Sequence, residues 1–422
     1  MNILLVVHDF LPKHLAGTEL YTYNLGRALK DRGHEVSVYT REYGYFEEKL
    51  KEEDTCYNGI KVKTIYFNSL SKRFKLPRKF YLDFYNRVLE NQFNRHLDEI
   101  KPDIIHIQHL KGLSASFISA ARKRKIPTVL TLHDYWFMCS TIQLFTTSSE
   151  RCSGPLFGLK CPRCLIPTLN PLIVWGLYPF HSVLFFFRTI YLKRLLNKVD
   201  LIIAPSKFLR NKFIEHGISE EKIIFSDNGM NTNILKSHTY KDNPNNKLRF
   251  AFIGSVMPHK GVHVLLEAFN KLTDRSAELR VYGDSHSSPN YYERLRLMAT
   301  NPAINFMGGF DNNRVYEILA DTDVLVVPSI WYENSPLTIH EAAIAGVPFI
   351  ASNIGGMAEL IERMKNGLLF QVEDTNDLYK KMKLLIDNPR LIKELKGKAE
   401  EVKTIEENAK ELEGIYSLFV RN

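Results

Sequence analysis

The sequence contains few cysteines for its length. Five occur among 422 residues, at positions 56, 139, 152, 161 and 164. The apolar start "MNILLVVHDF" has no basic region before it and no small-residue cleavage site, so we expect a cytoplasmic protein. In that compartment, so few thiols argue against a disulfide framework.

One nucleotide-binding pattern and one metal-binding pattern are also missing. The loop after the first strand-like segment lacks G-x-G-x-x-G, which weakens a nicotinamide-binding interpretation. The sequence offers no strong metal-binding D-x-D motif, because the "DTD" at 321–323 precedes an apolar strand and is predicted to form a cap and turn. We therefore expect catalysis that uses no metal and no cofactor.

The composition is that of a folded protein with more than one domain. Hydrophobic residues make up 45% and charged residues 24%, so we expect a folded chain with two α/β domains of about 200 residues each. The net charge of +9 is uneven: residues 1–228 hold 33 Lys and Arg against 22 Asp and Glu, and the remainder 23 against 25. The basic first half suggests an acidic partner, which is a membrane surface, a nucleic acid or a phosphorylated acceptor.

Apolar strand-like segments alternate with helical patterns along the chain. The first series is NILLVV, HEVSVYT, DIIHIQ, IPTVLTLH and DLIIAPS, and the second is LRFAFIG, ELRVYG, INFMG, DVLVVPS and PFIAS. This alternation predicts βαβ units and parallel sheets. A stretch rich in Asn, Ser and Lys separates the two series. We predict domains at 1–228 and 248–402, a linker at 229–247, and a C-terminal helix at 403–422 that packs back on the first domain.

Two glutamates, Glu333 and Glu341, stand eight positions apart in "WYENSPLTIHEAAIAGVP", between two predicted strands. Ser335 is predicted to be the N-cap of a short helix, Pro336 its first residue and Gly346 its C-terminal cap. Glu333 then lies on a loop at the carboxyl end of a strand, where open α/β sheets bind ligands. A carboxylate there suits ligand hydroxyls, and the helix N-terminus suits a diphosphate. Taken alone, the pair also fits a solvated glutamate and a capping one.

Loops suited to phosphate follow the first strand of each predicted domain. Gly17 and Thr18 open one helix, and Lys260 with Gly261 stands at the start of the other. Glycine lets the backbone approach a diphosphate closely, a helix N-terminus attracts anions, and lysine supplies a positive charge. Singly, each loop also fits an ordinary tight turn between a strand and a helix.

Together these segments resemble a known family. From Gly254 to Phe370 the chain is similar to the C-terminal domain of retaining, nucleotide-sugar-dependent glycosyltransferases, family 4-like (group 1), which share an E-x7-E motif. The matching stretches are "FIGSVMPHKG", "DVLVVPS", "ENSPLTIHEAAIAGVPFIASNIGG" and "NGLLF", with "GTELYTYNLGRALKDRGHEVSVYT", "LTLHDYWFMC" and "APSKFLR" in the first half. The resemblance implies an α/β protein of the GT-B fold, with two Rossmann-like domains facing an interdomain cleft.

The resemblance also implies roles for individual residues. Among the catalytic candidates, His133 would lie near the reacting carbon, Glu333 would touch donor-sugar hydroxyls, and Lys260 would neutralise the departing diphosphate. Glu341 would hold the ribose. One position departs from the family, because Ser255 stands where an arginine commonly contacts the phosphate. The rest of the donor site would come from Gly17, Thr18, Gly254, Asn334, Ser335, Pro336 and Leu337.

Four of the cysteines are close together in the sequence. Cys139, Cys152, Cys161 and Cys164 form C-x12-C-x8-C-x2-C just after "HDYWF". Four thiolates would bind zinc tetrahedrally and leave no open position, so such a site would be structural. Free thiols in an irregular loop are the alternative.

Residues 164–187, "CLIPTLNPLIVWGLYPFHSVLFFF", carry no charge. They reach the length of about 20 residues that crosses a bilayer, but prolines interrupt them and predicted strands of one domain flank them. We expect an apolar patch that lies in one leaflet on the inner face of the cell membrane; core packing is the alternative. The basic residues expected to meet anionic headgroups are Arg188, Lys193, Arg194 and Lys198.

Three classes of function remain open. The first is a retaining, hexosyltransferase-type enzyme that extends a lipid-linked or cell-envelope glycan from a nucleotide-diphosphate sugar, with no nucleic-acid partner. The second is a sugar-nucleotide epimerase on the same scaffold, and the third is a noncatalytic glycan-binding or assembly subunit. The first class uses both phosphate loops, both glutamates and the basic, apolar first half.

Overall fold

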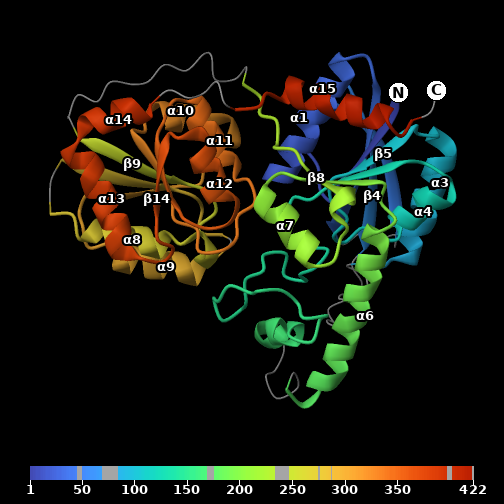
Figure 1. Cartoon of the computed structure of the whole chain (residues 1–422), viewed down its shortest axis with the longest axis horizontal. Helices are drawn as coiled ribbons and strands as arrows, with labels where there is room; N and C mark the ends of the chain where they lie inside the picture. The colour runs from blue at the N-terminus through green and yellow to red at the C-terminus, as the bar shows by residue number, and fades with distance from the viewer. Residues whose placement is uncertain are drawn as a thin grey trace. The chain divides into compact units, whose positions relative to one another are not determined.

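The computed structural model describes residues 1–44, 50–68, 84–168, 175–232, 247–273, 276–286, 288–396 and 402–420. They form two compact units (Figure 1). The first unit comprises Met1–Thr147, Cys152–Gly229 and Thr404–Asn422, and the second Ser148–Arg151 and Met230–Lys403. The chain therefore leaves the first unit and later returns to it. Most of the linker predicted at 229–247 lies outside the described residues.

The first unit is built on one sheet with the order β3-β4-β2-β1-β5-β6-β7-β8. β1 lies between β2 and β5 and pairs in parallel with both, and β3 is an antiparallel edge strand. The strands are β1 (Asn2–Val6), β2 (Glu35–Gly44), β3 (Leu50–Tyr57), β4 (Ile60–Asn68), β5 (Ile104–Ile107), β6 (Thr128–Thr131), β7 (Leu201–Ala204) and β8 (Ile223–Phe225). The helices are α1 (Gly17–Asp31), α3 (Arg87–Ile100), α4 (Phe117–Lys123), α6 (Tyr178–Leu196), α7 (Lys207–Glu215), α15 (Ile405–Ser417), and the 3₁₀ helices η1 (Cys161–Thr168) and η2 (Glu220–Lys222).

Helix α15 comes from the end of the sequence but belongs to the first unit, where it packs against α1. A capping box formed by Thr404 and Glu407 fixes its start. Tyr416 is fully buried, and its hydroxyl lies 2.6 Å from Nδ1 of His106 on β5. The Tyr21 hydroxyl of α1 donates to Asn408 of α15 at 2.8 Å. The helix is therefore part of the core of the first unit.

The second unit holds a sheet of parallel strands in the order β11-β10-β9-β12-β13-β14. By position along the chain this is the order 3-2-1-4-5-6 of Rossmann domains, which reverses between β9 and β12. The strands are β9 (Leu248–Ile253), β10 (Ala277–Tyr282), β11 (Ile304–Gly308), β12 (Val324–Val327), β13 (Phe349–Ser352) and β14 (Gly367–Phe370). The helices are α8 (Val262–Asn270), α9 (Pro289–Met298), α10 (Val315–Ala320), α11 (Leu337–Ile344), α12 (Gly355–Met364), α13 (Thr375–Asp387), α14 (Pro389–Leu395), and the 3₁₀ helices η4 (Pro258–Lys260) and η5 (Asn312–Arg314).

The predicted α/β class is confirmed, and each predicted strand segment contains a strand of one of the two sheets. β12 and β13 show why, because every residue of both strands is buried, as expected for parallel strands covered on two faces. The β3–β4 hairpin was not predicted. Its turn is Asn58-Gly59, both at positive φ, which is a strong hairpin signal, but β3 itself is exposed and charged.

Candidate functional site

In the second unit, two charged side chains meet where the strand order reverses. Lys260 ends η4 after β9, and Glu333 lies on the loop after β12. The Lys260 Nζ lies 2.6 Å from Glu333 Oε1, and the Ser329 hydroxyl donates to the same oxygen at 2.9 Å. Open α/β sheets bind ligands in the crevice at this reversal. The sequence suggested separate partners for the two residues, and the structure pairs them with each other.

Glu333 is ionised although it is buried. Burial alone would raise the pKa of its carboxyl, but the charge of Lys260 and hydrogen bonds from Lys260 and Ser329 hold that pKa below its ordinary value. Lys260 remains partly exposed. The site therefore holds a fixed anion beside a cation that solvent or a ligand can reach.

Two glycines bring the neighbouring loops into contact with the β12 loop. Gly261 has φ +69°, and a Cβ there would lie 1.9 Å from the Pro328 carbonyl oxygen. A Cβ on Gly356 would lie 1.6 Å from the carbonyl oxygen of Asn334, and the Gly356 N–H donates to the Glu333 carbonyl at 2.8 Å. Because only glycine fits at either place, the loop that carries Glu333 is held from both sides.

Helices α8, α11 and α12 follow β9, β12 and β13, which are neighbours in the sheet. None of the three has a side-chain hydrogen bond at its N-cap. Two first-turn amides are already used, since the His263 N–H donates to the Tyr291 hydroxyl at 3.2 Å and the Gly356 N–H donates to the Glu333 carbonyl. The helix dipoles nevertheless favour negative charge at these three helix starts. Gly254, predicted to bind the donor, directly follows β9 at the same edge.

The start of α11 corrects the predicted capping. Pro336 is the N-cap, in an extended conformation with ψ 121°, and Leu337 is the first helical residue. The Ser335 hydroxyl lies 2.8 Å from His340 Nε2, and no side-chain cap is formed at this helix. At the other end, Gly346 has φ +66° just after the C-cap, as the predicted C-terminal glycine requires.

Glu341 lies within α11, the helix that directly follows the loop of Glu333. Burial raises the pKa of its carboxyl to about 7. Among the described residues, no side chain donates a hydrogen bond to this carboxylate. Burial without a donor is costly for the charged form, so the carboxylate favours a ligand that brings hydroxyl groups.

In the first unit, histidines follow three neighbouring strands. His8, His109 and His133 each come two residues after the end of β1, β5 and β6. The rings of His8 and His109 lie 4.3 Å apart between centroids, across the point where this sheet reverses its order. His109 Nε2 donates to Asp134 Oδ2 at 3.0 Å, and His133 Nε2 donates to Gln108 Oε1 at 2.8 Å.

Burial shifts the pKa of several of these groups toward the range where the neutral form is favoured. The pKa of His133 is lowered to about 3, chiefly by burial and then by His109. Burial likewise lowers the pKa of His8 and raises that of Glu19, whose Oε1 lies 3.6 Å from His8 Nε2. At neutral pH His133 is therefore a neutral hydrogen-bonding group and carries no charge.

Sequence reasoning missed His8, Glu19 and His109. A usable signal was present, since "NILLVVHD", "DIIHIQH" and "TLHD" each end a predicted parallel strand with histidine. Within the described ranges, His8, Asp9 and Glu19 are also the group of three metal-binding side chains whose ligand atoms lie within 4.8 Å of one another. Arg41 Nη1 lies 3.5 Å from Asp9 Oδ1 and supplies positive charge there.

The predicted phosphate loop of the first unit stands beside this cluster. Gly17 and Thr18 are the first residues of α1, whose N-cap, Ala16, offers no side-chain cap. Glu19 in the same turn faces His8. The loop therefore joins a free helix N-terminus to the histidine cluster at the carboxyl edge of β1.

Family comparisons cover nearly the whole chain. The family model described as Glycosyltransferase Family 4 matches residues 15–234, more than half of the 422 residues. The chain belongs to glycosyltransferase family 4. The model described as glycosyl transferases group 1 matches residues 235–411. The family resemblance seen in the sequence is thus confirmed.

Relatives of this glycosyltransferase match over most of their length. An uncharacterized 42.6 kDa protein in the cps region of Klebsiella pneumoniae is 25% identical, over 90% of this chain and 91% of that protein. Among solved structures, sucrose-phosphate synthase from Thermosynechococcus elongatus has a TM-score of 0.69 at 17% identity, covering 99% of this chain and 98% of that one. HepE of Anabaena in complex with UDP and glucose has a TM-score of 0.67 at 17% identity, with 99% of both chains covered. These likenesses confirm the GT-B fold.

The cysteines of this family 4 enzyme lie in the irregular segment between β6 and α6. Burial, and then the neighbouring cysteines, raise the pKa of Cys161 to about 12 and that of Cys164 to about 11. Cys139 Sγ lies 3.2 Å from the Thr141 hydroxyl, and Cys152 Sγ accepts the Gly154 N–H at 3.4 Å. Cys56 is exposed on β3, away from this segment in the sequence.

Helix α6 carries the described end of the uncharged segment of the glycosyltransferase. No helix in the described part of the chain is both long enough and apolar enough to span a membrane. The prediction that Arg188 meets lipid headgroups is wrong, because Arg188 is buried and donates to the Trp136 carbonyl at 2.7 Å. Lys198 donates to the Ser119 hydroxyl at 3.2 Å. Arg188 turns inward because its helical position faces the aromatic residues Phe84 and Trp136.

Proposed function

We propose that this glycosyltransferase moves a sugar, with retention of configuration, from a nucleotide-diphosphate sugar to a glycan or lipid-linked acceptor in cell-envelope polysaccharide synthesis. The observation that carries the proposal is the Lys260–Glu333 pair between β9 and β12, at the edge of the sheet where α8, α11 and α12 begin. The UDP and glucose bound by HepE and the cps-region location of the Klebsiella protein support it.

Stabilisation of the leaving group would come from the second unit. As the sugar–phosphate bond breaks, negative charge grows on the diphosphate and positive charge grows on the sugar carbon. Preorganised positive charge at the diphosphate lowers this barrier, and Lys260 with the positive ends of the helix dipoles would supply it. We propose that these groups take the place of a metal ion. They would also take the place of the arginine that is common in the family at the position of Ser255.

The two glutamates would then act on different parts of the donor. Glu333 is a buried, ionised carboxylate, which suits sugar hydroxyls and a carbon that becomes cationic. Glu341 lacks a donor among the described residues and suits the ribose hydroxyls. His133 is neutral, so it would orient a sugar hydroxyl by a hydrogen bond and would not act through charge.

Nucleotide release is the direct test of the proposed reaction. The purified enzyme is incubated with UDP-, GDP- or dTDP-sugars and candidate acceptors, after thermal shift has identified the donor that binds. A donor at 100 times its dissociation constant adds about 2.7 kcal/mol of stability. Release of nucleotide with formation of a glycosylated acceptor supports transfer. An epimerised sugar nucleotide without transfer favours the epimerase, and binding without turnover favours the noncatalytic subunit.

We also propose that the four-cysteine segment binds structural zinc. The spacing supplies two close thiols at Cys161 and Cys164 and two more on the preceding loop. All four cysteines are described, but no three of their sulfur atoms lie within 4.8 Å of one another, so zinc would have to draw them together. Burial, and then the neighbouring cysteines, raise the pKa of both thiols, and a bound Zn²⁺ would favour their deprotonated forms. Elemental analysis should find one zinc per chain, lost in a Cys161→Ser/Cys164→Ser variant and retained in Cys56→Ser. A protein purified without chelator and free of zinc would contradict the proposal.

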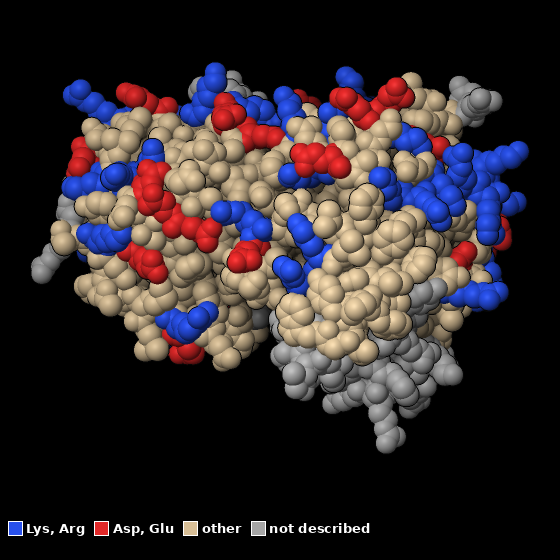
Figure 2. Space-filling view, turned by 60° about the horizontal axis from the view of Figure 1, so that its bottom comes forward, with Lys and Arg blue, Asp and Glu red and all other residues tan. Residues whose placement is uncertain are grey.

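Contact with a membrane surface is proposed for the apolar end of α6. Nine of the fifteen large apolar side chains exposed among the described residues fall between Leu156 and Phe187, so the exposure is concentrated in one region. Figure 2 brings the lower end of the first unit forward and shows a broad area there without charged side chains, with Lys and Arg near its border. Clustered apolar exposure of this kind marks an interaction surface.

Vesicle sedimentation tests this contact. We expect Phe180→Ser/Phe187→Ser to reduce recovery with vesicles of anionic phospholipid by at least about fivefold. The reason is that the variant loses two aromatic rings from the surface, because Phe180 is 57% exposed and Phe187 is 63% exposed. Leu297→Ser is the matched control, since Leu297 is 83% exposed in the second unit. Equal recovery of all three proteins would remove the membrane proposal and leave the transfer reaction untouched.

A further inference from the structure

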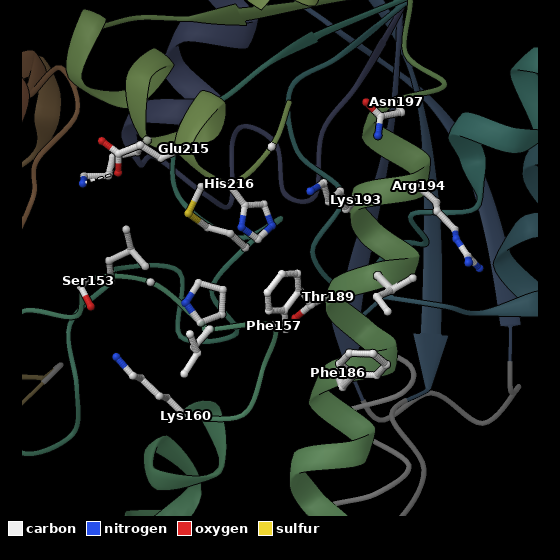
Figure 3. Close-up of a pocket in the computed structure, with 18 residues that line it drawn as sticks. Ser153, Phe157, Lys160, Phe186, Thr189, Lys193, Arg194, Asn197, Glu215 and His216 are labelled. Atoms are coloured by element: carbon white, nitrogen blue, oxygen red, sulfur yellow. Dashed lines mark hydrogen bonds and ion pairs between the residues drawn. The ribbon is translucent and has the colours of Figure 1, made fainter. Parts of the chain in front are cut away.

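A pocket lies in the first unit beside α6, apart from the histidine cluster. One wall is the loop 153–160, the second is α6 between Phe186 and Asn197, and the third is the end of α7 with His216 and Gly217 (Figure 3). Its volume is about 640 Å³, within the range of small-molecule sites. The function proposed above assigns nothing to this pocket.

The interior of the pocket is largely apolar. Met138, Leu144 and Ile190 line it, and Leu156, Phe157 and Phe186 line it where it opens to solvent. Leu156 and Phe157 are 55% and 61% exposed, so they belong both to the pocket and to the apolar surface of α6 and its preceding loop. Apolar side chains therefore line the pocket both inside and where it opens to solvent, as a hydrocarbon chain requires.

The pocket also carries an excess of positive charge. Lys160, Lys193 and Arg194 line it, and none of them pairs with a carboxylate among the described residues. A fourth cation, Lys212, pairs with Glu215 at 2.7 Å. These three lining cations thus remain unneutralised, and Figure 3 shows Lys193 directed toward His216 and Arg194 directed away from it. Positive charge beside an apolar interior complements a ligand with an anionic head and a hydrocarbon tail.

His216 adds an unused polar atom at the same place. In Figure 3 its ring and the Lys193 side chain point toward one another. Its Nε2 is buried and has no hydrogen-bond partner among the described residues. Burial, and then Lys193 and Arg188, lower the pKa of His216 to about 4, so the ring is neutral at pH 7 and can donate one hydrogen bond. A buried polar atom without a partner requires an explanation, and an acceptor oxygen of a ligand provides one.

We propose that this pocket binds a phosphate-bearing lipid, with the hydrocarbon chain among Met138, Leu144 and Ile190 and the phosphate at Lys193 and His216. The lipid would enter from the bilayer that the exposed end of α6 contacts. This route of entry rests on the membrane contact proposed above, whereas the binding of the lipid in the pocket does not. Neither sugar transfer nor the donor site of the second unit is needed for binding.

Calorimetric titration of the full-length protein tests the pocket without a membrane. The probe is decyl phosphate, below the concentration at which it forms micelles, compared with decyl maltoside and inorganic phosphate. We expect saturable binding of decyl phosphate, at least about tenfold weaker binding of decyl maltoside, and no saturable binding of phosphate. Equal affinity for decyl phosphate and decyl maltoside, or for decyl phosphate and inorganic phosphate, overturns the proposal.

Substitutions separate the pocket from the surface. Lys193→Ala should weaken decyl phosphate about tenfold, since a charge-assisted contact is lost, and should leave decyl maltoside unchanged. Lys123→Ala is the matched control on α4. Ile190→Trp should fill the pocket and abolish binding of both decyl phosphate and decyl maltoside. Phe180→Ser/Phe187→Ser should keep full affinity for decyl phosphate even when vesicle recovery falls. An unaltered affinity in a folded Lys193→Ala protein contradicts the assignment.

Discussion

The two units use the same kind of sheet but equip its reversal point differently. Between β9 and β12 the second unit places opposite charges, Lys260 and Glu333, in direct contact. Between β1 and β5 the first unit places two histidine rings, His8 and His109, against each other. One scaffold thus supports two electrostatic environments, and the loops after the strands decide which one forms.

The difference assigns different tasks to the two units. Fixed charges stabilise charge that develops during a reaction, whereas neutral rings hold hydroxyl groups by hydrogen bonds. Glu333 is held ionised by Lys260, and His133 is held neutral by burial. The second unit should therefore contribute more to the rate than the first unit, and substitutions can test this ranking.

The largest effect is expected from Glu333→Gln. The substitution keeps the shape but removes the ionised partner of Lys260, so turnover should fall by about 10²-fold while the donor KM changes little. Steady-state kinetics with saturating acceptor measures both constants. Glu317→Gln is the control, because Glu317 pairs with Arg314 at an exposed site. A Glu333→Gln enzyme with near-normal kcat would refute the role of the fixed anion.

A smaller effect is expected from Glu341→Gln. If Glu341 binds ribose alike in the ground and transition states, the donor KM should rise roughly tenfold while kcat stays unchanged, which corresponds to one charge-assisted hydrogen bond. A fall in kcat with constant KM would instead place Glu341 beside the reacting sugar and make the two glutamates equivalent.

The pH dependence of stability offers a second test of Glu341. Its pKa of about 7 in the folded protein lies above the ordinary value of a glutamate. Its contribution to stability is therefore fully present below about pH 4.5 and is lost as the pH rises through 7. Between pH 5 and pH 8, the melting temperature of the ligand-free enzyme should fall relative to that of Glu341→Gln. A constant difference between the two proteins would show that the carboxylate is solvated.

The smallest effect is expected from the first unit. His133→Ala should lower kcat about fivefold, because a neutral hydrogen bond contributes about 1 kcal/mol. Since the pKa of His133 is about 3, its protonation lies below the range from pH 5 to pH 8, and the pH profile of kcat should keep its shape in the variant. A loss larger than that of Glu333→Gln would reverse the ranking of the two units.

The sheets were predictable because their strands are short apolar runs that parallel sheets bury on both faces. β9 and β12 show this, since both follow from their hydrophobic residues alone. The exposed β3 strand has no such run, so only its Asn58-Gly59 turn marked the hairpin. Burial on two faces leaves a stronger pattern in the sequence than pairing at an edge.

The candidate site was predictable as a set of loops, but its contacts were not. Lys260 and Glu333 are 73 positions apart, and their ion pair follows from strand order, which the sequence does not state. His8 and His109 meet for the same reason. The prediction for Arg188 was wrong because polar and apolar side chains are not segregated to different faces of α6, so periodicity could not show which face turns inward.

The return of the chain to the first unit has a consequence for biosynthesis. Ile405, Ala409, Leu412 and Tyr416 of α15 complete a core that also holds Ile3 and Leu5 of β1. Translation produces β1 first and α15 about 400 residues later, with the whole second unit in between. The second unit can thus form its own core on the ribosome while the core of the first unit still lacks helix α15. Nascent chains that stop before Thr404 should expose apolar surface from the first unit and become substrates for chaperones and proteases.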